Sequence, residues 1–228
     1  NANYEISGDL SLTIPKLFLP KFLMPKRRLW QTTPSTVITL SRETINRSNY
    51  FRRHILSSEL TYIFQPTKQS VHKISPIIVE YDRLAHMTDK YLDKVLESPI
   101  LTASAKDYFI TKMRYNYRFT SPMSYRHPIY FSTTLTEASN ILALGYLAAG
   151  KSWNEKDKVT FKAPFSQFVK AEVDWRKTWS IGDHSSLVAH AQAGVLKVYG
   201  NSDSAPYSEY FYVGGANNVR AFSARSIG

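Results

Sequence analysis

The sequence contains no cysteine, which excludes disulfide bonds, thiolate metal sites and cysteine nucleophiles. It also lacks a long hydrophobic run, because the longest apolar stretches, such as Ile141–Ala149, fall well short of the roughly 20 residues that a membrane-spanning helix needs. A helical membrane protein is therefore excluded. Acidic residues are too few to balance the basic ones, so the net charge of +11 favours an acidic partner. As the acidic partner we expect anionic lipid or lipopolysaccharide phosphate, and we do not expect nucleic acid.

Apolar side chains are present but dispersed. Aromatic residues make up 14% of the chain, with 15 Tyr and 4 Trp, yet the mean hydropathy is only -0.31. From Tyr4 to Ile14, apolar residues or glycine hold the even positions and polar residues the odd ones between them. This period of two is typical of a β-strand with two different faces. The same pattern predicts strands at 4–14, about 36–45, 53–64, about 76–83, 106–119, 165–179 and about 187–195, with 129–143 ambiguous in phase. The total is about eight strands.

The length of these strands and the spacing between them favour a membrane barrel. Strands of nine or more residues with one apolar and one polar face suit a bilayer, where every backbone group must pair without water. The connections also alternate, with tight turns at 65–70 and 180–184 and long connections at 84–105 and 146–163. The fold class predicted is all-β, a transmembrane antiparallel β-barrel of which about eight strands are present.

Two connections stand out. The segment 84–105 carries apolar residues at helical spacing, so we expect a short external helix there. The segment 15–35 contains four prolines, which break any strand. Its position in the alternation makes it a periplasmic connection, and the pattern does not explain its length.

One set of charged side chains shares the face opposite the apolar one. These residues are expected to line a polar lumen, since the same charges facing lipid would cost several kcal/mol. They are Lys112, Arg114, Arg118, Lys170, Glu172, Asp174 and Arg176.

Other candidate chemistry is weak. Gly145, Gly150, Lys151 and Ser152 match the phosphate-binding loop pattern, but no apolar stripe follows that would dock the helix this loop requires. The six histidines show no paired metal spacing, and the run 183–186 lacks the context of a catalytic triad. The basic cluster at 26–28 has too few interleaved aromatic residues for a stacking surface. No enzyme, metal or cofactor is predicted.

The end of the chain carries a recognisable motif. Gly214 and Gly215 precede Val219, Arg220, Ala221 and Phe222. This resembles the signature Val/Ile-Arg-Gly-Phe/Tyr of the outer-membrane assembly-factor superfamily, the surface antigen family that includes the barrel-assembly insertase and the translocation-and-assembly-module barrel. Alanine at 221 replaces the usual glycine, which would cost about 1 kcal/mol if that position needs a positive φ. The composition is similar to Bacteroidetes members.

The resemblance implies a fold and a function. Residues 1–228 would be a fragment of one outer-membrane barrel domain of a Gram-negative bacterium and would contribute the fourth to eleventh of its sixteen strands. The fragment would end in the sixth external loop at about 201–228, which folds into the lumen. Arg220 would be a lumenal anchor, with Glu172 and Asp174 as candidate acidic partners. The barrel would insert or translocate unfolded outer-membrane protein clients, aided by periplasmic or lipoprotein accessory subunits. A passive porin or transporter barrel remains the alternative, and a soluble nucleotide-binding protein is a third.

Overall fold

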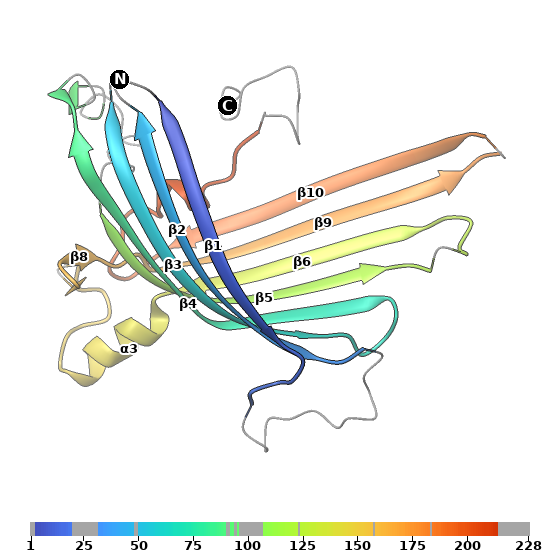
Figure 1. The fold of residues 1–228 in the computed structure, drawn as a ribbon, viewed down its shortest axis with the longest axis horizontal. Coiled ribbons are helices and arrows are strands. Elements are labelled where there is room, and N and C mark those ends of the chain that lie inside the picture. The colour runs from blue at the N-terminus through green and yellow to red at the C-terminus, as the bar shows by residue number, and fades with distance from the viewer. Residues whose placement is uncertain are drawn as a thin grey trace.

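The structure is a computed structural model that describes residues 3–19, 32–47, 50–89, 92–93, 95, 107–122, 124–156, 158–182 and 184–213. Eight of its strands form one antiparallel sheet, in which each strand pairs with its neighbours in the chain (Figure 1). These strands are β1 (Tyr4–Ile14), β2 (Ser35–Arg47), β3 (Phe51–Phe64), β4 (Ser70–Met87), β5 (Tyr108–Thr120), β6 (Ile129–Ala138), β9 (Phe168–Ser180) and β10 (Ser186–Val198). The predicted eight-stranded antiparallel arrangement is confirmed.

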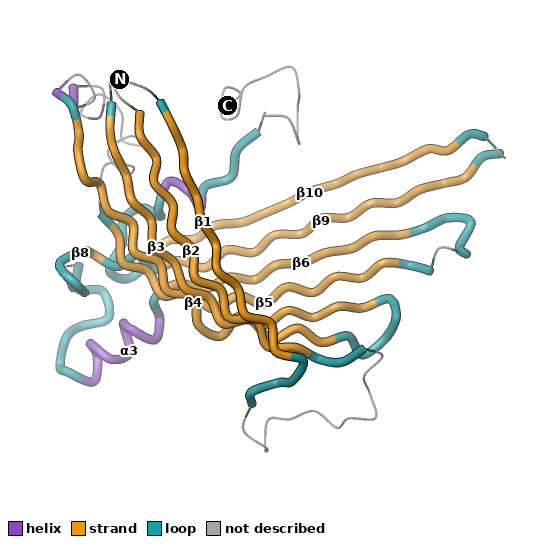
Figure 2. The backbone as a smooth tube through the Cα atoms, viewed as in Figure 1, coloured by secondary structure: helices purple, strands orange, loops and turns teal. Residues whose placement is uncertain are grey.

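The sheet is long-stranded and strongly curved. Figure 2 shows β1–β4 rising steeply while β5, β6, β9 and β10 run across the view, so that the sheet encloses a concave side. The sheet has connections at both ends. At one end lie 15–34, 65–69, 121–128 and 181–185, and at the other lie 48–50, 88–107, 139–167 and the segment 199–213. Among the described residues β1 pairs only with β2 and β10 only with β9, so the sheet has two edges.

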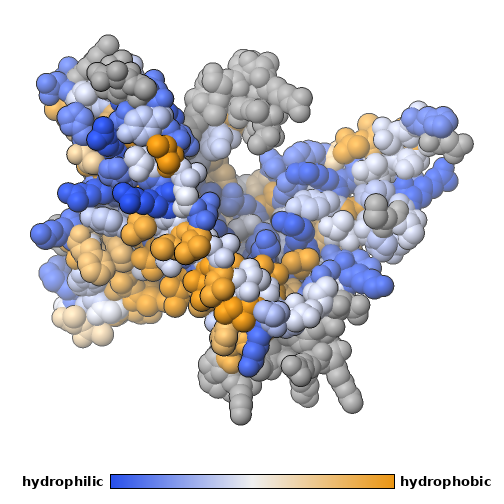
Figure 3. Space-filling view, in the orientation of Figure 1, coloured by the Kyte–Doolittle hydropathy of each residue, from blue (hydrophilic) through white to orange (hydrophobic). Residues whose placement is uncertain are grey.

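The convex face is apolar over most of its length. Exposed apolar side chains gather on β1–β4, with hydrophilic ones above them (Figure 3). Along β1 and β2 the pairing places Leu10 beside Leu40 and Leu12 beside Ile38. Large exposed apolar residues continue this surface at Ile6, Leu56, Ile77, Met113, Leu135, Val173 and Val195. A water-exposed surface of this extent is unfavourable, whereas the same surface against lipid is favourable.

Strand β4 is much longer than the predicted segment 76–83. Its register shifts against β3 between Ile74 and Ile77 and against β5 between Ser75 and Ile78, and each shift places one extra residue in β4. Pro76 lies in this β-bulge, where its missing N–H costs no ladder hydrogen bond. The bulge puts Ile74 and Ile77 on the same face, so a strict period of two ends there. The sequence pattern therefore revealed only the part of β4 beyond the bulge.

The connection between β6 and β9 is built differently from the prediction. The ambiguous segment 129–143 divides into β6 and a helix, α3 (Asn140–Ala148), and a small hairpin of β7 (Val159–Thr160) and β8 (Ala163–Pro164) follows. Both lie beside the large sheet (Figure 1). In the connection after β4, the described residues 89, 92–93 and 95 are helical, as expected. Among the described residues, no helix is both long and apolar enough to cross a membrane.

The two faces should respond differently to charge. We expect Leu10→Arg to lower the free energy of unfolding by about 2–4 kcal/mol, because Leu10 is 73% exposed on the apolar face. Ser11→Arg, one residue along and on the concave side, is the matched control and should cost less than about 1 kcal/mol. Guanidinium titration of the full-length protein in lipid vesicles measures both. Equal destabilisation by the two variants would contradict the assignment of the faces.

Candidate functional site

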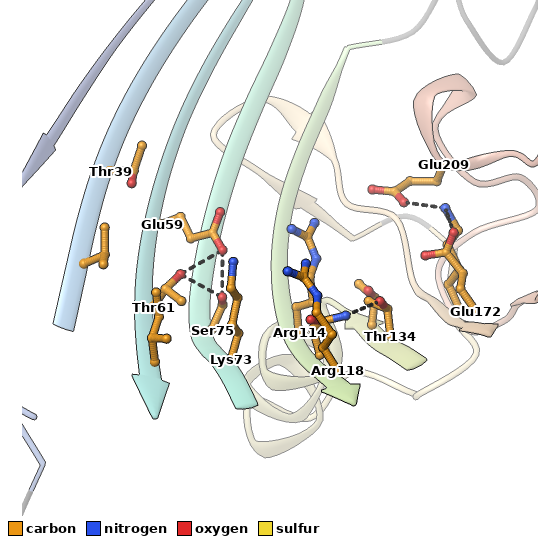
Figure 4. A pocket seen from close by; sticks show the side chains of 15 residues that line it. Thr39, Glu59, Thr61, Lys73, Ser75, Arg114, Arg118, Thr134, Glu172 and Glu209 are labelled. Carbon is orange, nitrogen blue, oxygen red and sulfur yellow. Dashed lines mark hydrogen bonds and ion pairs between the residues drawn. The ribbon is translucent and has the colours of Figure 1, made fainter. Parts of the chain in front are cut away.

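The concave face is polar and holds a cavity of about 530 Å³. Charged and hydroxyl side chains from β2 to β9 line it, and Figure 4 shows Glu59, Arg114 and Glu172 projecting toward the same space. Glu59 accepts hydrogen bonds from the hydroxyls of Thr61 and Ser75 at 2.9 and 2.7 Å. The predicted inward position of the charges on β5 and β9 is confirmed, because Arg114, Arg118, Lys170 and Glu172 all line this cavity.

The chain beyond β10 turns back over this face. Gly200 has a φ of 64°, and a Cβ there would lie 2.3 Å from Oε1 of Gln167. Asn201 is buried and donates its side-chain N–H groups to the carbonyl oxygens of Lys158 and Phe165, at 2.9 and 3.0 Å. Its backbone N–H donates to Oε1 of Gln167 at 2.7 Å. These bonds join the start of the segment to the residues that precede β9.

Glu209 carries the main contact between this segment and the sheet. It lies in a 3₁₀ turn, η3 (Tyr207–Glu209), and its carboxylate meets Nζ of Lys112 at 2.9 Å and Nζ of Lys170 at 3.6 Å. Lys112 also pairs with Glu80 at 2.8 Å, and its side chain is only 5% exposed. One glutamate of the loop is thus held between lysines of β5 and β9.

The electrostatics of Glu209 favour the charged form. Burial alone would raise the pKa of its carboxyl group. The charge and hydrogen bond of Lys112, with the charges of Lys170 and Arg114, outweigh burial and hold this pKa below its usual range. A carboxyl whose pKa is depressed by folding stabilises the folded state above its unfolded pKa and loses that contribution as pH falls. The anchor is therefore in place at neutral pH.

An aromatic contact holds the loop next to β10. The ring of Phe211 lies 4.9 Å from Nζ of Lys170 in a cation–π arrangement. A Cβ at Gly194 would lie 2.3 Å from Cζ of Phe211, so only glycine leaves space for the ring. The ring therefore packs directly on the backbone of β10.

A small apolar cluster seals the same end of the concave face. Ala205 of the loop packs with buried side chains from three strands, and its backbone N–H donates to the hydroxyl of Tyr210 at 3.3 Å. The buried members are Tyr108, Ile110, Ala138, Phe168 and Ala205, and Leu196 and Val198 pack against them. The loop is thus held by apolar contacts through Ala205 and by ion pairs through Glu209.

Glu172 and Asp174, the two acidic partners predicted for Arg220, both lie on the concave side, but Asp174 has more hydrogen-bond partners. Asp174 accepts hydrogen bonds from the guanidinium of Arg176 at 2.9 and 3.2 Å, and Gln192 donates to it at 3.1 Å. Its oxygen also lies 3.1 Å from Nε2 of His190. Glu172 lies 3.5 Å from Nζ of Lys170, and its side chain is 41% exposed. The motif residues Gly214, Gly215, Val219, Arg220, Ala221 and Phe222 lie outside the described residues.

The phosphate-loop match has the wrong surroundings. Gly150-Lys151-Ser152 follows the C-terminus of α3, whereas a phosphate loop needs the N-terminus of a helix to follow it. The ammonium of Lys151 pairs with Glu155 at 2.6 Å, and Glu155 also accepts the N–H of Ser152 at 3.2 Å. In the part of the chain that the structure describes, no group of three or more acidic or histidine side chains could hold a metal ion.

Comparison with known protein families gives a match for the part of the chain that contains this loop. Residues 149–228 match the model of the Omp85 superfamily domain. This segment is an Omp85 superfamily sequence. It includes the hairpin β7–β8, strands β9 and β10, and Glu209. No curated protein matched the chain.

The Omp85 match indicates which environment each face of the sheet contacts. Proteins of this superfamily are outer-membrane β-barrels that assemble or translocate proteins and are not enzymes. The matched segment, which supplies β9 and β10 of the sheet, is accordingly part of an outer-membrane assembly or translocation barrel. The apolar convex face is the lipid-facing surface, and the polar concave face is the lumenal one.

Several residues of the Omp85 loop contact were missed from the sequence. Glu209 lies in a tyrosine-rich segment with no strand pattern, and Asn201 and Phe211 belong to the same region. Gly194 offered the one usable signal, because glycine inside a regular strand often marks a close approach of another group. Partners separated by 97 residues, as Lys112 and Glu209 are, leave no local pattern.

Removing the charge of Glu209 should loosen the loop. Glu209→Gln keeps the shape but leaves Lys112 paired only with Glu80, so we expect a loss of about 1–3 kcal/mol in unfolding free energy and faster protease cleavage within 199–213. Lowering the pH below about 4 should loosen the wild-type loop in the same way, whereas the Gln variant lacks this change. Glu155→Gln, an exposed pair elsewhere, is the control. An unchanged cleavage rate in Glu209→Gln would refute the anchor.

A second test addresses the packing of Phe211. Gly194→Ala should displace the ring and destabilise the protein by about 1–3 kcal/mol. In the double variant with Phe211→Ala the clash disappears, so the two effects should be non-additive. A double-mutant cycle by guanidinium titration measures the coupling. Additive effects would mean that Phe211 does not pack there.

Proposed function

We propose that this protein inserts or translocates outer-membrane protein clients and that the segment after β10 is the sixth external loop, held in the lumen of the barrel. The contact of Glu209 with Lys112 and Lys170 supports this most directly, since it holds the loop against the concave face. A loop in this position obstructs an open channel, which favours an assembly barrel over a passive porin.

We further propose that residues 1–228 form part of one barrel domain of about sixteen strands, as its fourth to eleventh strands. Unpaired backbone groups are costly in lipid, so the edges at β1 and β10 each call for a further strand. The end that carries the 199–213 segment is then external. The Pro-rich connection 15–34 lies at the opposite, periplasmic end.

Within this loop we propose that Arg220 is the lumenal anchor and that Glu172 is its partner. Asp174 already accepts hydrogen bonds from Arg176 and Gln192, so a new partner would have to displace them. Among the described residues the carboxylate of Glu172 forms an ion pair only with Lys170, at 3.5 Å, and Glu172 lines the cavity. A charge-assisted bond there would add to the Glu209 contact.

The proposed partners follow from the two faces. Unfolded outer-membrane protein clients and periplasmic or lipoprotein accessory subunits belong to the assembly role, and outer-membrane lipid and lipopolysaccharide contact the convex face. Clients would enter at a seam between the first and last strands of the complete barrel.

The test uses the full-length protein reconstituted in vesicles with an unfolded eight-stranded outer-membrane barrel as client. We expect the wild-type protein to speed client insertion at least several-fold over empty vesicles, measured as heat-modifiable migration. Arg220→Ala should reduce this rate and the stability of the barrel, while Arg126→Ala, at the periplasmic turn, should not. Client insertion no faster than in empty vesicles would refute the proposed function. Wild-type behaviour of Arg220→Ala would refute the role of Arg220 as the lumenal anchor.

A further inference from the structure

The convex face carries an apolar groove of about 420 Å³. Its floor is formed by neighbouring strands, since Leu40 lies opposite Ser58 and Leu56 opposite Tyr81 in the sheet register. The apolar side chains that line it are Leu40, Leu56, Val79, Tyr81, Phe109 and Phe161. The groove lies on the face opposite the lumen, within the lipid-facing surface.

Phe161 forms one wall of the groove from outside the sheet. It occupies the turn of the β7–β8 hairpin, where Phe161 and Lys162 have φ angles of 51° and 65°. Its ring meets that of Phe109 edge-on at a centroid distance of 4.9 Å, yet Phe161 remains 73% exposed. A phenylalanine held out by a strained turn is costly in water and suits a surface covered by acyl chains.

Basic side chains border this groove toward the end that carries the loop. Arg42 lies two residues beyond Leu40 on the same face of β2, which is roughly 7 Å along the strand. In the next rows of the sheet Arg83 lies opposite His54, and Arg52 lies opposite His86. All three arginines are exposed, and none of them forms an ion pair with another residue that the structure describes. Arg52 donates one hydrogen bond, from Nε to Oδ1 of Asn46 at 3.3 Å.

We propose that this groove and its arginine border form a binding site for a membrane lipid with a phosphorylated headgroup. An acyl chain lies in the groove, and the headgroup phosphate is bound by Arg42, Arg83 and Arg52. The site is continuous with the lipid-facing surface, and its charge complements phosphate, for which the planar guanidinium is suited. The proposal rests on the lipid-facing assignment of the convex face and on the external placement of this end, and it is independent of client insertion.

The experiment measures lipid retention by native mass spectrometry on the full-length protein in mild detergent, with bisphosphorylated lipid A as probe. We expect Arg42→Gln with Arg83→Gln to raise the dissociation constant at least tenfold. Lys68→Gln with Arg126→Gln, the same change of charge in exposed turns at the opposite end, should stay within twofold. Phe161→Ala, at an exposed turn where folding is not at risk, should weaken binding several-fold. Heat-modifiable migration verifies that each variant is folded.

Two further arms identify the ligand chemistry. Dephosphorylated lipid A should bind at least tenfold more weakly, and millimolar inorganic phosphate should not displace lipid A from the wild-type protein. Equal binding of the dephosphorylated lipid, displacement by inorganic phosphate, or an unaffected double-arginine variant would each overturn the proposal. Loss of client insertion with lipid A binding intact would count against the proposed function alone.

Discussion

A strand in a bilayer must pair every backbone N–H and carbonyl group within the protein, and this constraint determines most of what is seen here. Once the backbone is committed to long antiparallel ladders, successive side chains point to opposite faces. One face then meets lipid and the other water, so β5 places Met113 on the convex side and Lys112 and Arg114 on the concave side. The polar lumen is a direct consequence of the alternation.

The contact of Glu209 with Lys112 and Lys170 holds a loop against the concave face in a chain that has no cysteine for a disulfide bond. Burying a lone carboxylate would cost several kcal/mol, but Glu209 enters a site that already holds two ammonium groups. Lys112 is also paired with Glu80, and Lys170 has Glu172 beside it. Each ammonium group therefore has a second carboxylate besides that of Glu209, so we expect the two Glu209 ion pairs to contribute a moderate stabilisation to the docked loop.

The same alternation explains how much of the fold could be predicted. Strands such as β1 and β9 keep one phase throughout, so the pattern located them closely. In β4 the bulge at Pro76 shifts the phase, and a pattern of fixed period lost the first part of the strand. Helix α3 was missed because the sequence 140–148 is apolar on most sides, with Ile141, Leu144 and Leu147 all exposed. The run has neither a strand pattern nor a polar face.

The site was harder to predict than the fold because its contacts are long-range. Alternation showed correctly that Lys112 and Lys170 face inward, but it contained nothing about which loop residue would reach them. Asn201 binds Lys158 and Phe165 and so helps to set the path that the chain follows from β10 to Glu209. Gly194 must then leave space for Phe211. Each of these contacts requires the three-dimensional path of the chain, and a path of this kind is specified by several weak interactions acting together, none of which has a periodic signature.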